Sequence, residues 1–450
     1  MEDRRLTETH AWLGREAAAM GGVHKIRFYP FVLERSEGVR VWDVDGNEYL
    51  DLIAAGGVLQ TGTGHPQVRQ AILDELDRSW STMLCTYPAP PTMALAERLC
   101  ATFPGDAPRA AWFGTSGSDA NDCLGKLLPV ATGRRRLVSF VGAYHGQTAG
   151  SAALSGHSTQ ARTIGTGNIT KVPYPYCYRC LWDCSGPDDC ALQCLSYLED
   201  FVLANVSPAE DTAAILLEAM QSDGGDVPAP PRFVRALREL CDRHGIWLAF
   251  DEVKVGLGRS GTMWAFEQSG VTADALAAGK PLGGGLPLSA VVARRELLDA
   301  DIYNLYTLGG APVPCAAGLA TLDVIREEGL MVNASAVGEQ LRAGLRELAR
   351  SHPSIGDVRG MGLMLGFELV EDRASKAPAS RLAARLVYRC FELGLMVIYC
   401  GLLANVIEMT PALTLSHDDA ERALAIIDHA LTDCEAGRFD DSKIAPYAGW

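Results

Sequence analysis

Residues 213–251, AAILLEAMQSDGGDVPAPPRFVRALRELCDRHGIWLAFD, indicate the fold class of this chain most directly. Two short apolar runs, Ala213 to Leu217 and Ile246 to Phe250, enclose a stretch with helical periodicity from Pro231 to His244. Such apolar runs are typical of strands buried on both faces, and their alternation with helices favours a parallel sheet. The stretch therefore predicts one strand–helix–strand unit of an α/β layer.

The same rhythm extends over the middle of the chain. Further apolar runs lie at 110–114, 137–141, 275–278 and 288–293, and helix-like stretches separate most of them. After a helix expected from about Cys315 to Glu327, the pattern changes to mixed α+β. We therefore expect three parts. Residues 66–315 form a large α/β domain, residues 316–450 form a smaller α+β domain, and residues 1–65 pack with that smaller domain.

Composition narrows the classes of function. The chain has 450 residues, 48% of them hydrophobic, and 40 Lys and Arg against 55 Asp and Glu give a net charge of −15. This charge repels phosphate backbones, so we expect no nucleic-acid partner. No apolar run approaches the roughly 18 residues of a membrane span, and the first residues lack a secretory apolar run. We therefore expect no membrane partner and a cytoplasmic location.

A possible anion site lies at residues 115–121, TSGSDAN, directly after an apolar run. Glycine and small hydroxyl residues at the start of a helix present free backbone N–H groups to an anion, and the helix dipole assists. Ser116, Gly117 and Ser118 are the candidate residues for binding a phosphate. An ordinary helix cap, with no bound anion, would show the same residue pattern.

Three further features stand at the ends of apolar runs, where parallel sheets collect ligands. Asp251 is an acid that can hold a cationic ring nitrogen, although a helix cap or surface acid has the same pattern. Lys280 precedes three glycines and can act as an amine nucleophile if it is partly desolvated, although a flexible loop is the plainer interpretation. Tyr144 offers a face for stacking, or else belongs to the core. Together with the anion site, these are the parts that an enzyme dependent on pyridoxal 5'-phosphate (PLP) requires.

The order of these parts resembles the class III aminotransferases of PLP fold type I. Seven blocks of sequence look like that family: VWDVDGNEYLDL, GTSGSDAN, YHG, LLEAMQSDGG, DEVKVGLGRSG, GKPLGGGLPLSAV and TLGGAPVPCAAGLA. The resemblance covers nearly the whole chain. It implies a large domain with a mostly parallel seven-stranded sheet flanked by helices, and a smaller α+β domain formed by both termini.

The resemblance also implies catalytic roles. Lys280 would bind the aldehyde of PLP covalently and later move the proton between substrate and cofactor. Asp251 would keep the pyridine nitrogen protonated, while Val253 and Tyr144 would pack on the two faces of the ring.

Other cofactor contacts are implied in the same way. The phosphate would bind at Ser116, Gly117 and Ser118, joined by Thr307 from a second subunit, so a homodimer is the expected assembly. Glu218 matches a family acid beside the aspartate. His145 has either a cofactor-binding or a purely structural role.

Two departures from the family pattern concern the substrate. Lys254 stands where the family often has a glutamine that bonds the cofactor's phenolic oxygen; it would serve as another such donor or as a second base. Glu408 in NVIEMTPALT stands where members with amino-acid substrates commonly have the arginine of NVIRxxPPLT. An acid there replaces the positive charge that binds a carboxylate with a negative one, which suits a cationic or polyhydroxylated substrate.

The leading hypothesis is therefore a ping-pong transaminase. It takes an amino group from glutamate or glutamine and delivers it to a carbonyl on an amine-rich sugar, as in the aminoglycoside-biosynthesis branch of the family. The alternatives are an epimerase or racemase acting on an amine-bearing carbon, and a transaminase of amino acids or ω-amino acids. A thiol-rich binding module on an inactive scaffold is a fourth, weaker hypothesis.

Five of the thirteen cysteines lie between Cys177 and Cys194, in CYRCLWDCSGPDDCALQC. Their spacings of two and three residues are compatible with zinc or an iron–sulfur cluster. Similar cysteine-bearing insertions occur in family members that need no metal. The sequence therefore leads us to expect reduced structural thiols and no metal.

Overall fold

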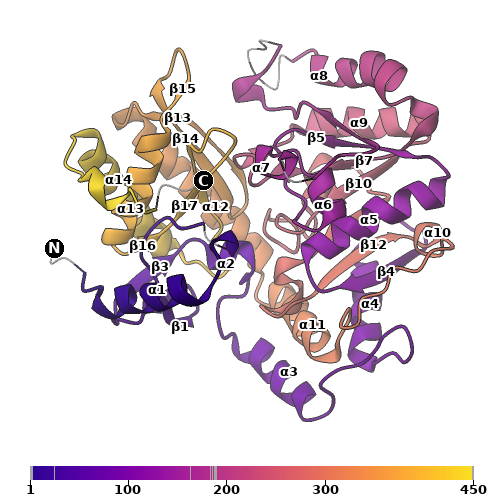
Figure 1. The fold of residues 1–450 in the computed structure, drawn as a ribbon, viewed down its shortest axis with the longest axis horizontal. Coiled ribbons are helices and arrows are strands. Elements are labelled where there is room, and N and C mark those ends of the chain that lie inside the picture. The colour runs from indigo at the N-terminus through magenta and orange to yellow at the C-terminus, as the bar shows by residue number, and fades with distance from the viewer. Residues whose placement is uncertain are drawn as a thin grey trace. The chain divides into compact units, whose positions relative to one another are not determined.

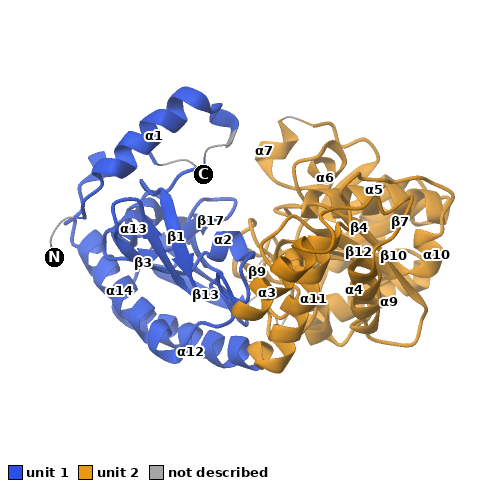
Figure 2. Ribbon diagram, turned by 90° about the horizontal axis from the view of Figure 1, so that it is seen from below, with its two compact units in different colours: residues 1–65, 332–450 blue, residues 66–331 orange. Residues whose placement is uncertain are grey.

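The structure is a computed structural model that describes residues 4–24, 26–162, 164–182, 184, 186 and 190–447. The chain divides into two compact units (Figure 2). Unit 1 comprises residues 1–65 and 332–450, and unit 2 comprises residues 66–331. The division differs from the expected boundary at 315/316, which falls inside helix α11 (Pro312–Glu327). This helix packs extensively on α3 (Pro66–Leu76) and α4 (Pro90–Ala101), so it belongs to unit 2.

Unit 2 contains a seven-stranded sheet in the order β4-β12-β11-β10-β7-β5-β6. Only β12 runs antiparallel to its neighbours, β11 and β4, while β11, β10, β7, β5 and β6 pair in parallel. The predicted PLP fold type I sheet is therefore confirmed. The strands are β4 (Arg109–Gly114), β5 (Arg136–Phe140), β6 (Ile169–Val172), β7 (Thr212–Leu217), β10 (Trp247–Asp251), β11 (Ala275–Ala278) and β12 (Ser289–Arg294).

The strand–helix–strand stretch forms as predicted, with α9 (Pro231–His244) between parallel β7 and β10. Pro230 and Pro231 start the helix, and Gly245 ends it with φ +60°, a conformation that favours glycine. Phe233, Val234, Leu237, Leu240 and Cys241 are buried on one face of α9. The face fits the 3.6-residue helical period, so the burial of apolar side chains fixes how the helix lies on the sheet.

Further helices and short elements complete unit 2, and Figure 1 shows α5, α6 and α9 around its sheet. The helices are α5 (Gly117–Thr132), α6 (Ala149–Leu154), α7 (Ser158–Ala161), α8 (Gln193–Ser196), α10 (Arg295–Leu298) and the π-helix η3 (Tyr197–Val206). The short elements are β8 (Met220–Gln221), β9 (Val227–Pro228), η2 (Cys177–Arg179), η4 (Ala209–Asp211), η5 (Ala265–Ser269) and η6 (Lys280–Gly283). One face of α5 contributes Ala120, Leu124 and Leu127 to a core shared with β7, β10, β11 and β12.

Unit 1 has two small sheets. The first has the order β1-β2-β3-β16, and its β16 pairs in parallel with β3, so the N-terminal segment and the C-terminal part of the chain share one sheet. The second has the order β13-β14-β18-β17, with β15 paired to β14. The strands are β1 (Leu33–Glu37), β2 (Arg40–Asp43), β3 (Glu48–Asp51), β13 (Ile355–Met361), β14 (Met364–Asp372), β15 (Ala377–Pro378), β16 (Leu395–Met396), β17 (Ile398–Cys400) and β18 (Val406–Met409).

Helices cover these sheets: α1 (Thr7–Ala19), α2 (Ala54–Gly57), α12 (Leu330–Ser351), α13 (Ser380–Glu392) and α14 (His417–Glu435), with short turns η1 (Gly22–His24) and η7 (Asp441–Lys443). Within the described ranges, none of the helices combines the length and the apolar character that crossing a bilayer requires.

Candidate active site

A pocket in unit 2 gathers most of the residues singled out in the sequence. They come from the segments that follow the carboxyl ends of β4, β5, β7, β10 and β11, as expected for a parallel sheet. The residues that line the pocket are Gly117, Ser118, Asn121, Tyr144, His145, Gly146, Glu218, Ser222, Asp251, Val253, Lys254, Val255 and Lys280. Neighbouring strand ends thus bring together side chains that are up to 163 positions apart, from Gly117 to Lys280.

The pocket side of α5 is built to receive an anion. Gly117 is the first residue of this 16-residue helix, and Gly117 and Ser118 both line the pocket. A Cβ atom on Gly117 would lie 2.5 Å from Cγ1 of Val253, so only glycine lets the two segments approach this closely. The N–H groups of a helix N-terminus have no partner within the helix and favour a phosphate.

Ser116, by contrast, does not line the pocket. Its Oγ accepts a hydrogen bond from Asp119 N at 3.2 Å, while the Asp119 carboxylate accepts one from Ser116 N at 3.1 Å. This reciprocal pair is a capping box, which stabilises the start of α5. The hydroxyl oxygen of Ser116 thus caps the helix, and the pocket lining here consists of the next two residues.

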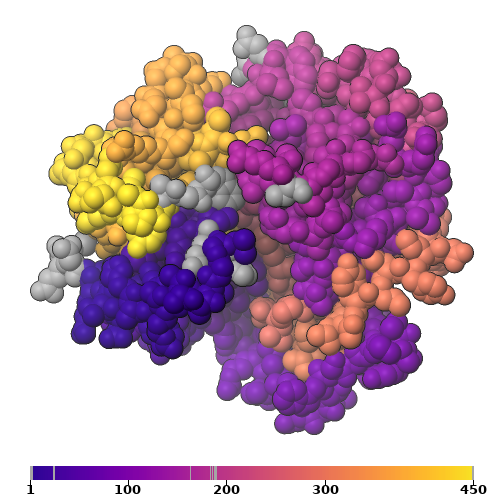
Figure 3. Space-filling model, in the orientation of Figure 1, coloured from indigo at the N-terminus to yellow at the C-terminus, as the bar shows by residue number. Residues whose placement is uncertain are grey.

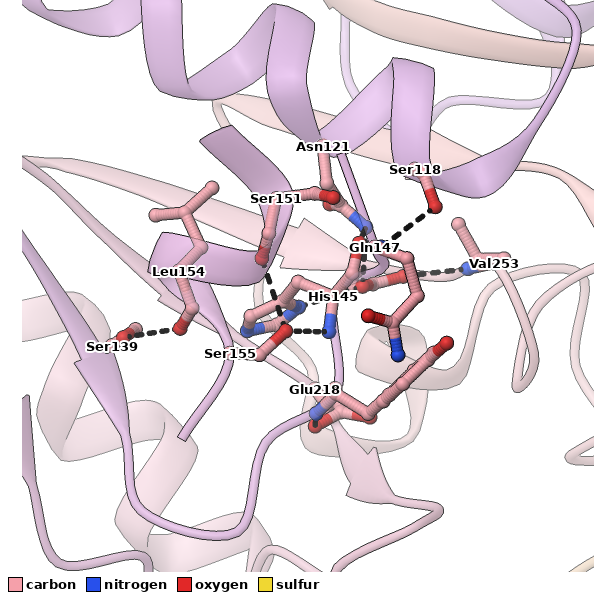
Figure 4. Close-up of polar contacts among 12 residues, drawn as sticks. Ser118, Asn121, Ser139, His145, Gln147, Ser151, Leu154, Ser155, Glu218 and Val253 are labelled. Atoms are coloured by element: carbon pink, nitrogen blue, oxygen red, sulfur yellow. Dashed lines mark hydrogen bonds and ion pairs between the residues drawn. The ribbon is translucent and has the colours of Figure 1, made fainter. Parts of the chain in front are cut away.

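Asp251 is buried at the end of β10, and three groups hold its carboxylate (Figure 4). Asn121 Nδ2 donates to Oδ2 at 2.7 Å, and Val253 N donates to Oδ1 at 3.0 Å. His145 Nδ1 lies 2.7 Å from Oδ2. Because Nδ1 faces a carboxylate oxygen, which accepts hydrogen bonds, we place a proton on Nδ1, which donates to Asp251. Nε2 of His145 is buried with no hydrogen-bond partner among the described atoms. The carboxylate is therefore fixed in orientation and available to a ring N–H.

Asn121 is a site residue to which the sequence interpretation assigned no role. It lies four positions after Gly117 on α5, so both residues face the same side of the helix. Its Nδ2 also donates to the backbone oxygen of His145 at 2.9 Å, which ties α5 to the segment after β5. The four-residue spacing within TSGSDAN is the signal that could have identified it.

Glu218 is a second buried acid beside Asp251. The pKa of Glu218 is raised well above its usual value, mainly by burial and secondly by the nearby charge of Asp251. Tyr144 N donates to Glu218 Oε2 at 3.3 Å (Figure 4), and Tyr174 donates its hydroxyl to the Glu218 backbone oxygen at 2.8 Å. Glu218 is therefore a buried acid whose protonated form is favoured by its surroundings.

Lys280 begins η6, directly after β11, and its φ is +45°. A residue other than glycine seldom adopts this backbone conformation, and such strain is concentrated at functional positions. Lys254, 9% exposed, lines the same pocket and supplies a second amine. Val253 and half-buried Tyr144 also line it, in agreement with their expected place beside a ring.

Two further expected site residues are not among those that line the pocket. Thr307 is exposed in a turn of the segment 301–308 and is not part of the pocket lining of its own chain. The residues around this segment, coloured salmon in Figure 3, lie on the face of the molecule that the view shows. Glu408 belongs to unit 1, where it is buried on β18 opposite Gly366 of β14 and Ile398 of β17.

The pocket residues fit PLP. Gly117 and Ser118 would receive the phosphate, Asp251 the pyridine nitrogen and Lys280 the aldehyde carbon. The fit rests on two features of the chain itself, the space kept free at Gly117 and the carboxylate held by three groups. These features define a PLP-dependent enzyme of fold type I.

Comparisons with known proteins agree. The model of the family described as aminotransferase class-III matches residues 22–431. The chain is 38% identical over 435 residues to isoleucine 2-epimerase of Lentilactobacillus buchneri, covering 95% of each chain. It is 36% identical over 431 residues to 4-aminobutyrate aminotransferase of Escherichia coli K12, covering 95% and 97%. A crystal structure of an amine transaminase from an uncultivated Pseudomonas species, in its PLP-bound form, superposes with a TM-score of 0.84 at 30% identity over 92% and 97% of the two chains.

The chain therefore belongs to the class III aminotransferase family, and PLP is its cofactor. Its predicted family, fold class and cofactor are confirmed.

Proposed function

We propose that this enzyme transfers an amino group from a donor amino acid, glutamate or glutamine, to a carbonyl on an amine-rich sugar of the aminoglycoside type. The observation that carries this proposal is Glu408. It stands where the family pattern for amino-acid substrates has an arginine, and it is 1% exposed on a strand that is otherwise apolar, Val406-Ile407-Glu408-Met409.

A buried carboxylate favours a cationic group and disfavours another carboxylate. Placing an acid at an arginine position therefore favours acceptors that carry ammonium groups or hydroxyl donors over acceptors that present an α-carboxylate there. The net charge of −15 supports the same choice over longer distances, because an acidic surface attracts polycations.

The chain's own residues supply the remaining functions of the reaction. When bound, PLP supplies an aldehyde that combines with amines and a ring that accepts electrons from the reacting carbon. Lys280 provides the amine that holds the cofactor and takes the proton from the substrate carbon. Asp251, oriented by Asn121 and His145, would accept a hydrogen bond from the N–H of the ring nitrogen. Glu218 lines the same pocket as a second acid beside Asp251.

We further propose that the enzyme works as a homodimer. Thr307 is exposed and absent from the pocket lining of its own chain. It would complete the phosphate site of the neighbouring subunit, beside Gly117 and Ser118.

The test is a substrate panel with detection of products by mass. Wild-type enzyme should aminate oxidised aminoglycosides at least about tenfold more efficiently than simple keto acids, and Glu408→Arg should reverse that order. Glu421→Arg is the matched control, because it changes the net charge equally at an exposed position of α14 and should leave the preference unchanged. The proposal fails if the wild type prefers keto acids, or 4-aminobutyrate and other ω-amino acids, and Glu408→Arg does not alter that preference.

A second candidate function is epimerisation at an amine-bearing carbon. Two observations favour it: the similarity to isoleucine 2-epimerase and the second amine, Lys254, in the pocket. Inverting a carbon requires proton delivery on both faces, and Lys280 and Lys254 would serve opposite faces. Incorporation of solvent deuterium into an amine that is retained, with no keto product, would establish this function in place of transfer.

A further inference from the structure

Unit 2 contains a cluster of thiols outside the PLP pocket. Cys177, Cys180, Cys184, Cys190 and Cys194 line one small cavity, together with aromatic side chains from neighbouring segments. Cys177 belongs to η2 and Cys194 to α8, so the cavity gathers thiols from separate elements. The cavity thus brings together cysteines that are 13 positions apart in the sequence, from 177 to 190.

Backbone N–H groups point at two of the sulfurs. Trp182 N donates to Cys180 Sγ at 3.4 Å, and Leu192 N donates to Cys190 Sγ at 3.3 Å. Both bonds run from the residue two positions after the cysteine. Hydrogen bonds to sulfur stabilise a metal-bound thiolate and fix its orientation.

The turn after Cys190 is strained. Leu192 has φ +55°, which is uncommon for a leucine and persists only when the surroundings determine it. Arg232 of α9 donates to the Cys190 backbone oxygen at 2.9 Å and holds this turn against the helix. The surrounding structure thus maintains the turn that presents Cys190 to the other thiols.

We propose that Cys177, Cys180, Cys184 and Cys190 bind one zinc ion in a closed, structural site. Zinc prefers four tetrahedral thiolate ligands in such sites, and C-x₂-C spacing, as in Cys177 and Cys180, is typical of them. Each thiol gives up its proton when it binds, and neither the metal nor the sulfur changes oxidation state. The two N–H···S bonds, which the sequence does not reveal, favour a metal over the expected reduced structural thiols.

Binding would tighten the cluster. In the described part of the chain, no three of these sulfurs lie within 4.8 Å of one another, so the ion would draw them together. The consequence is structural. The ion would hold the cysteines next to Tyr174, which lines the same cavity and donates its hydroxyl to the Glu218 backbone oxygen. The site would therefore stabilise one wall of unit 2 and take no part in amino transfer.

The experiment measures the metal content of holoenzyme purified without chelators. We expect about one zinc ion per chain, and cobalt(II) substitution should give the intense absorption of tetrahedral cobalt thiolates. Cys184→Ser should lose the zinc and lower the Tm, while it retains a full complement of PLP. Cys85→Ser, at an exposed thiol outside the cluster, and Cys194→Ser, which removes the fifth thiol, should both retain the metal.

Stoichiometric iron with sulfide, disulfides among these cysteines, or five reduced thiols without metal would each overturn the zinc site. Loss of zinc from Cys194→Ser together with its retention in Cys184→Ser would overturn the choice of ligands. Because the readout is metal content, a wrong proposal about the sugar substrate would leave these outcomes unchanged, and the two failures are distinguishable.

Discussion

Gly117→Ala should weaken PLP binding without unfolding the protein. The added Cβ would lie 2.5 Å from Cγ1 and 3.0 Å from Cγ2 of Val253, whereas carbon atoms in favourable contact are about 3.5–4.0 Å apart. Val253 must therefore move by about 1 Å, into a pocket that it lines. Overpacking of this kind costs about 1–3 kcal/mol, which corresponds to roughly 5-fold to 150-fold in affinity. Titrating the apoenzyme with PLP and following absorbance gives the Kd directly.

Two companion variants test the reasoning. Gly125→Ala places a methyl group on the same helix, α5, where the nearest atom is the flexible Cδ1 of Leu154 at 3.3 Å. It should leave the Kd unchanged. Val253→Ala should relieve the clash, so the double variant Gly117→Ala/Val253→Ala should bind PLP more tightly than the two single changes predict when added. Wild-type affinity in a folded Gly117→Ala protein, or strict additivity in the double variant, would refute the close approach as the reason for glycine.

Two other variants test the rest of the site, and a third tests Glu252, a buried acid that follows Asp251 in the chain. Lys280→Ala should reduce amino transfer by about 10²-fold or more, because the proton-transferring amine is lost, with an unchanged circular dichroism spectrum; activity near the wild-type rate would contradict its role. Asn121→Leu removes the donor to Asp251 Oδ2 and should cost about 1.5–3 kcal/mol, measured as a lower Tm and weaker PLP binding; no change in either would show that His145 and Val253 suffice. Burial raises the pKa of Glu252 to about 8, so the native state retains a proton that the unfolded state releases, and stability should fall as pH rises from about 4.5 to 8 by up to about 5 kcal/mol. Glu252→Gln should flatten that part of the Tm profile, and an unaltered profile would exclude Glu252 as its source.

Much of the active site was accessible from the sequence because the chemistry lies at strand ends. Asp251 ends β10, and Gly117 begins the helix after β4. Apolar runs reveal where buried strands stop, and the topology of a parallel sheet then places the following residues at one edge. The seven family blocks added the assignment of PLP, since the residues alone left a helix cap, a surface acid and a loop lysine as alternatives.

Other features required the folded chain. The role of Ser116 could not be distinguished from that of Gly117 or Ser118, because only its bond with Asp119 shows that its hydroxyl caps the helix. The unit boundary lies beyond α11 because that helix packs on α3 and α4, which are more than 200 positions earlier in the chain.

By itself, the sequence determined the alternation of strands and helices, the family and the lysine–aspartate pair, because hydrophobic period and local motifs are properties of neighbouring residues. The tertiary structure decided which thiols share a cavity and which side chains bond Asp251, namely Asn121 and His145. Such contacts join residues from separate elements, and hydrogen bonds act only over about 3 Å. Their partners are therefore fixed by how the elements pack, which no local pattern records.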